Sequence, residues 1–135
     1  MNKLLPLLFF TYFIHANEIQ FNSIDEYKDG TLNVSFNLEQ VAYINSYALE
    51  NPSRLVLEIN DAYSKKPINE IYNYPIKKIR SSQDNNLTRV VIDLYDHVFW
   101  HKPIQKQEDS GILMNIKLLK DKSLKENMRD IIVAI

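Results

Sequence analysis

The chain has 135 residues, of which 45% are hydrophobic and 24% charged, and its formal net charge is −1 at pH 7. This composition is typical of one globular domain with appendages, and the absence of a Lys/Arg stripe argues against nucleic acid as a partner. Cysteine is absent, which excludes a disulfide framework, a thiol nucleophile and any Cys-based metal site.

Residues 1–16 have the pattern of a secretory signal peptide. Lys3 provides a basic start, an apolar stretch runs from Leu4 to Ile14, and Ala16 is a small residue suited to cleavage. The stretch is shorter than the roughly 20 residues that a membrane-spanning helix needs. We therefore expect export to the periplasm, with no membrane span after cleavage.

The region 17–119 is predicted to be all-β. Apolar residues alternate with polar ones in two clear runs, Leu32/Val34/Phe36/Leu38 and Ile112/Met114/Ile116/Leu118. Turn signals separate such runs at Asp29-Gly30, Asn51-Pro52, Asp84-Asn85-Asn86 and Ser110-Gly111. Strands at this spacing favour a sandwich or barrel, and no long amphipathic helix is expected before Lys120.

An internal repeat indicates the architecture. Residues 51–61 match residues 86–96 at an offset of 35, with Asn, Arg, Val and Asp identical and most other positions conservative. Two copies of a strand pair predict a pseudo-symmetric sandwich of two small β-sheets rather than a solenoid, which needs three or more repeats.

The alternation within each copy of the repeat assigns side chains to faces. We predict a core position for Leu55, Leu57, Ile59, Val90, Ile92 and Leu94. The intervening residues should face solvent or a ligand, namely Arg54, Val56, Glu58, Arg89, Val91 and Asp93. An Arg and an acid four residues apart on one strand lie roughly 13 Å apart, so each needs a cross-strand partner, water or a ligand.

These repeated segments resemble the AMIN domain. The resemblance is carried by 51–59, by Ile79-Arg-Ser-Ser-Gln83 and by Thr88-Arg-Val-Val-Ile-Asp-Leu94, and it extends over 18–119. AMIN domains are the all-β targeting modules of periplasmic N-acetylmuramoyl-L-alanine amidases, and they also occur in secretins of type IV pili. The resemblance implies a module that binds peptidoglycan and directs an amidase to septal cleavage, with division-site proteins as further partners.

The C-terminal residues extend the resemblance to the amidase itself. Residues 120–130 read as a charged linker, and 128–135 resemble the strand that opens the family's zinc amidase domain, so 131–135 are expected to be the first strand of a domain that is missing here. The family's first zinc-binding His would follow Ile135. The resemblance therefore assigns no catalytic or metal residue to this chain, expects zinc only in the missing domain, and implies that the chain alone is inactive.

Candidate peptidoglycan-binding residues lie on the outward faces. Arg54, Arg80 and Arg89 are suited to hold stem-peptide carboxylates, and Trp100, with Tyr95 or Phe99, is suited to lie on a sugar ring. The alternative is that the arginines are solvated or ion-paired and that the aromatics belong to the core or its rim.

Other functions remain open at this level. The main alternative is a non-enzymatic envelope module, such as the N-terminal domain of a pilus secretin or a stand-alone adaptor, and a further one is a β-rich adhesin. His97 and His101 would ligate a metal together on a helix, but on a strand their rings lie roughly 13 Å apart, so no metal site is expected.

Overall fold

The computed structural model describes residues 17–119. The predicted signal peptide 1–16, the linker 120–130 and the strand 131–135 lie outside the described residues. Within them the chain forms strands and connections without a helix, as the alternation predicted. Consequently, no helix in this part of the chain is long and apolar enough to cross a membrane.

The strands follow one another closely along the chain. They are β1 (Asn17–Glu26), β2 (Thr31–Leu38), β3 (Ile44–Leu49), β4 (Arg54–Asn60), β5 (Ala62–Tyr63), β6 (Asn69–Ile71), β7 (Ile76–Asp84), β8 (Leu87–Leu94), β9 (Phe99–Trp100), β10 (Ile104–Glu108) and β11 (Gly111–Leu119).

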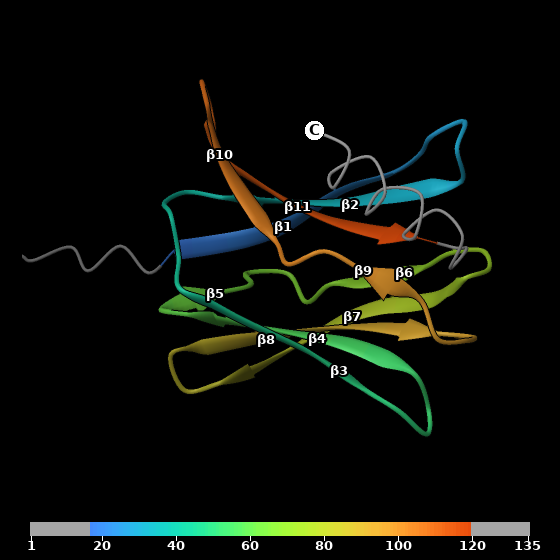
Figure 1. Ribbon diagram of the computed structural model, residues 1–135. Coiled ribbons are helices and arrows are strands. Elements are labelled where there is room, and N and C mark those ends of the chain that lie inside the picture. The colour runs from blue at the N-terminus through green and yellow to red at the C-terminus, as the bar shows by residue number, and fades with distance from the viewer. Residues whose placement is uncertain (1–16, 120–135) are drawn as a thin grey trace, which may run out of the picture.

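Two sheets packed face to face make the predicted all-β sandwich (Figure 1). The first sheet has the order β10-β11-β2-β1-β5, with β9 paired to β11, and the second has the order β3-β4-β8-β7-β6. All pairs are antiparallel except β1 with β5. Such sheets keep one face on the core and leave the other for solvent or a ligand.

The core lies between the sheets and is built from the alternating residues that the sequence indicated. In the first sheet the two predicted runs lie directly opposite each other, with Phe36 beside Met114 and Val34 beside Ile116. Every member of both runs is at most 3% exposed, as are all six core positions predicted within the repeat. Full burial of one large aliphatic side chain contributes about 1.5–3 kcal/mol, so these rows supply most of the driving force for packing.

The four predicted turns connect consecutive strands. Gly30 (φ 87°), Asn85 (φ 53°) and Gly111 (φ 139°) adopt left-handed conformations in the turns that precede β2, β8 and β11. Asn51 (φ 59°) does the same before β4. Glycine and asparagine tolerate this region best, which explains why these residues stood out between the apolar runs.

Both copies of the internal repeat lie within the second sheet. The offset of 35 maps β3 and β4 onto the end of β7 and onto β8, and the two copies meet where β4 pairs with β8. Val56 and its repeat partner Val91 are directly opposite each other in that pair. The repeat therefore does not relate the two sheets of the sandwich to each other, as the sequence had suggested; its pseudo-symmetry is a local two-fold axis through the middle of one sheet.

Polar contacts join the two sheets at their edges. The buried hydroxyl of Thr88 donates a hydrogen bond to the carbonyl of Ala62 in the first sheet (2.7 Å). At another edge the Gln105 side chain brackets the backbone of Ala42, accepting from its N–H (2.8 Å) and donating to its carbonyl (2.7 Å). These bonds satisfy backbone groups that have no strand partner.

Candidate binding face

The outer face of the second sheet carries all three arginines singled out from the sequence. Residues that alternate with the core positions form three rows across its strands, because the register places them opposite one another. The rows are Asn45/Glu58/Arg89/Ser82, Tyr47/Val56/Val91/Arg80/Asn69 and Leu49/Arg54/Asp93/Lys78/Ile71. We call this surface the outer face.

Val56 and Val91, in the middle row, differ from the prediction. They point away from the core, as expected, but are only 2% and 6% exposed, so they do not face solvent. Their cross-strand neighbours Tyr47 and Arg80 have long side chains, and the apolar parts of such side chains cover neighbouring methyl groups. The outer face thus has a small apolar centre of its own, formed by Val56 and Val91, and carries an ion pair toward each of its two ends.

At one end, Arg89 is held by carboxylates. Its Nη2 donates to Glu58 Oε2 at 3.0 Å and lies 4.0 Å from Asp84 Oδ2. Asn45 completes the group by donating to Glu58 Oε1 (3.3 Å). The hydrogen bond to Glu58 raises the pKa of Arg89 above its ordinary value. This is the cross-strand partner that the strand spacing required.

Toward the other end of the outer face, Arg80 forms an ion pair with Asp93. Its Nε donates to Asp93 Oδ2 (2.8 Å) and its Nη2 to Oδ1 (3.3 Å), a bidentate contact. This bond raises the pKa of Arg80. Two parallel hydrogen bonds between a guanidinium and a carboxylate are stronger and more directional than a single contact. Both oxygens of Asp93 are therefore engaged by Arg80.

Within residues 17–119, Arg54 is therefore left without a carboxylate partner. The two-fold axis relates Arg54 to Arg89. Asp93 lies directly across from Arg54 in β8, but its carboxylate is paired with Arg80. The position that corresponds to Asp84 is Leu49, which has no charge. Among the described residues Arg54 pairs with no acid, and its Nη1 donates to the carbonyl of Pro52 at 2.8 Å.

A shallow hollow adjoins this second end of the outer face. It has a volume of about 280 Å³ and is lined by Pro52, Ser53, Lys77, Lys78, Asp93 and Leu94. A bulge at Lys77 shifts the register between Ile76 and Lys78, which brings two consecutive lysines to the hollow. This end of the outer face thus carries three cationic side chains, Arg54, Lys77 and Lys78, around Asp93, whose carboxylate is already paired with Arg80. We call it the cationic end.

The two lysines were not among the residues predicted from the sequence. The sequence did contain a signal for this bulge, the two isoleucines Ile76 and Ile79 spaced three residues apart. Both are fully buried in the structure. Two core residues at that spacing cannot share one face of a regular strand, whose side chains alternate with period two. An apolar pair spaced by three inside a strand is therefore the pattern of a bulge.

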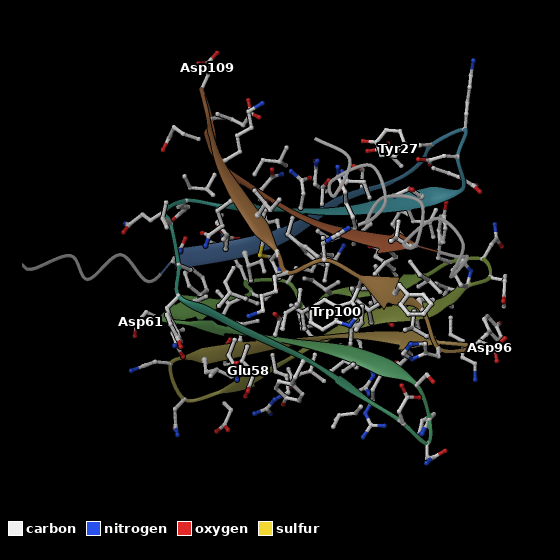
Figure 2. The ribbon with its side chains drawn as sticks, in the orientation of Figure 1. Tyr27, Glu58, Asp61, Asp96, Trp100 and Asp109 are labelled. Atoms are coloured by element: carbon white, nitrogen blue, oxygen red, sulfur yellow. The ribbon has the colours of Figure 1, made fainter. Side chains whose placement is uncertain are left out.

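Trp100 lies apart from the three arginines. It belongs to β9, which pairs with β11 in the first sheet, and it packs partly buried against the core. Figure 2 shows Trp100 between the two layers, Glu58 on one part of the second sheet and Asp96 beyond its opposite end. Phe99 is also partly buried, whereas Tyr95 is 54% exposed and directly follows β8 beside the cationic end.

The histidines have separate surroundings. His97 Nδ1 lies 3.0 Å from Glu50 Oε1, and the backbone N–H of His101 donates to the carbonyl of Lys117 (3.1 Å). Within residues 17–119 no group of three or more His, Asp or Glu side chains is arranged to hold a metal ion. The donors that zinc requires are thus not gathered in this part of the chain, and no chemical step through zinc follows from it.

These features together describe a β-sandwich whose second sheet has a charged outer face with a shallow hollow beside it. The AMIN domain family model matches residues 19–114, well over half of the 135 residues. The chain therefore belongs to the AMIN domain family, whose members are peptidoglycan-binding and targeting modules of amidases and secretins and occur in envelope proteins. No curated protein matches the chain.

Proposed function

We propose that this domain binds peptidoglycan in the periplasm through its outer face and targets a cell-wall N-acetylmuramoyl-L-alanine amidase to septal peptidoglycan. Membership of the AMIN family supports peptidoglycan as the ligand. The single observation that carries the choice of surface is Arg54, a guanidinium that has no carboxylate partner among residues 17–119 and lies beside a hollow with two lysines.

The chemistry of the cationic end suits the peptide part of peptidoglycan. Stem peptides carry carboxylates, and a guanidinium binds a carboxylate through two parallel charge-assisted hydrogen bonds. Arg54 is free to do so at the cost of one bond to a backbone carbonyl. Arg80 and Arg89 would first have to release Asp93 and Glu58, so we expect them to contribute less.

Co-sedimentation of the purified full chain with isolated sacculi tests this assignment. Replacing Arg54, Arg80 and Arg89 together by Ala should remove most of the binding, and Arg54→Gln alone should remove more of it than Arg89→Gln. The last two variants are a matched pair, since the two-fold axis relates their positions. Equal pelleting of the wild type and the triple variant, with unchanged thermal melting, would refute the role of the arginines.

The parent enzyme is a separate part of the proposal. It is supported by the resemblance of residues 128–135 to the strand that opens a zinc amidase domain, and zinc would then belong to that domain. Sequencing the gene beyond codon 135 tests it: an in-frame Asp-X-Gly-His-Gly-Gly segment supports an amidase, and a secretin module contradicts it. The chain itself should release no stem peptides from sacculi when zinc is added.

A further inference from the structure

Exposed hydrophobic side chains gather at the cationic end. Of the eight large hydrophobic residues that are exposed among residues 17–119, four lie where β3, β6 and β8 end: Leu49, Ile71, Tyr74 and Tyr95. Leu49 and Ile71 stand in the same row as Arg54 and Lys78. Single exposed apolar residues need no explanation, but a cluster beside polar groups is typical of a binding surface.

Tyr74 and Tyr95 form the centre of this cluster. Their ring centroids are 5.9 Å apart and the rings meet at 37°, so they are splayed rather than stacked. The residues are 59% and 54% exposed. Backbone and side-chain bonds hold them in place, because the N–H of Tyr95 donates to the carbonyl of Pro75 (3.0 Å) and the Tyr74 hydroxyl donates to Asp96 (3.4 Å).

Lys77 connects the tyrosine pair to the hollow. Its Nζ lies 5.0 Å from the centroid of the Tyr95 ring, a cation–π distance, and the same residue lines the hollow beside Lys78. The aromatic pair and the carboxylate-binding groups are thus immediate neighbours. Two other acids occur at this end, but Asp96 is engaged by Tyr74 and Glu50 by Ser53 and His97.

We propose that Tyr74 and Tyr95 form a sugar-binding subsite next to the cationic end, so that the domain recognises a sugar together with its attached stem peptide. A pyranose ring presents C–H groups that pack on the electron-rich face of an aromatic ring, and a tyrosine hydroxyl adds a hydrogen-bonding group at the rim. This inference rests on the proposed function and specifies which element of peptidoglycan is bound.

The subsite is tested by titrating the full chain with three soluble probes in a calorimeter: a disaccharide-peptide from peptidoglycan, a chito-oligosaccharide and a free stem peptide. The double change of Tyr74 and Tyr95 to Ala should weaken binding of the disaccharide-peptide about tenfold, as expected when one or two aromatic contacts are lost. The double Ala variant should no longer bind the chito-oligosaccharide, and its affinity for the free stem peptide should stay within about twofold of the wild-type value.

Two control variants make the result specific. Changing both tyrosines to Phe keeps the rings and should retain most of the affinity, and Tyr43→Ala removes a 73% exposed tyrosine away from this end and should change nothing. Unaltered affinity of the double Ala variant for the disaccharide-peptide would overturn the subsite while sacculus binding by the wild type still supported the proposed function. A wild-type chain that bound neither sacculi nor the disaccharide-peptide would overturn both.

Discussion

Replacing Val56 by Thr tests whether the apolar centre of the outer face is truly covered. The substitution keeps the shape and the β-branching of the side chain, and therefore most of its strand propensity, but exchanges a methyl group for a hydroxyl. Val56 is 2% exposed and faces Tyr47 and Val91 across the sheet. A hydroxyl buried there without a partner should destabilise the domain by about 1–3 kcal/mol.

The expected change is large enough to measure by thermal melting of the full chain followed by circular dichroism. For a domain of this size, a loss of 2 kcal/mol lowers Tm by roughly 8–16 °C. Ile71→Thr is the matched control, because Ile71 lies on the same face but is 83% exposed, and it should change stability by at most about 0.5 kcal/mol. If Val56→Thr melted like the wild type, the centre of the outer face would be open to water and the argument from burial would fail.

Two further predictions concern a turn and acid stability. Gly111→Ala should cost about 1–3 kcal/mol, because φ is 139° and an added Cβ would lie 2.7 Å from the carbonyl oxygen of Leu38; an unchanged denaturant midpoint would contradict this. Hydrogen bonds from Ser53 and then His97 lower the pKa of Glu50 below its usual 4.5, so Glu50 stabilises the fold above that pH and loses this effect as pH falls through its lower folded value. Glu50→Gln should therefore flatten the dependence of the unfolding midpoint on pH below about 4.5, and an equally steep acid limb in the variant would refute the assignment.

The fold was predictable because its main signals are local. Alternation marks each half-buried strand, Gly30 and Asn85 mark turns, and the same positions that read as core are buried in the structure. The repeat was also visible, but its position within one sheet was not, because strand order depends on pairings between distant residues. The pairing of β2 with β11, which brings Phe36 beside Met114, leaves no trace in either segment alone.

The candidate site was predictable only in part. All three arginines lie on the outer face, but which acid each one binds depends on the register and on the bulge at Lys77. For that reason the sequence did not indicate that Arg80 would take the acid opposite Arg54. Tyr74 was missed because it lies in a connection, outside the period-two pattern, and its nearness to Tyr95 arises only when β7 and β8 pair.

The position of β11 governs when the domain can fold. This strand is the last of the described residues, yet it lies inside the first sheet between β10 and β2. Until residues 111–119 are available, β2 has an unpaired edge and its apolar row lacks the facing row that Met114 and Ile116 provide. Contacts between such distant segments slow folding, and an open apolar edge invites pairing with other chains. A chain interrupted before β11 should therefore aggregate rather than fold. Pairing of β11 with β2 is thus the step that converts an aggregation-prone intermediate into the folded domain.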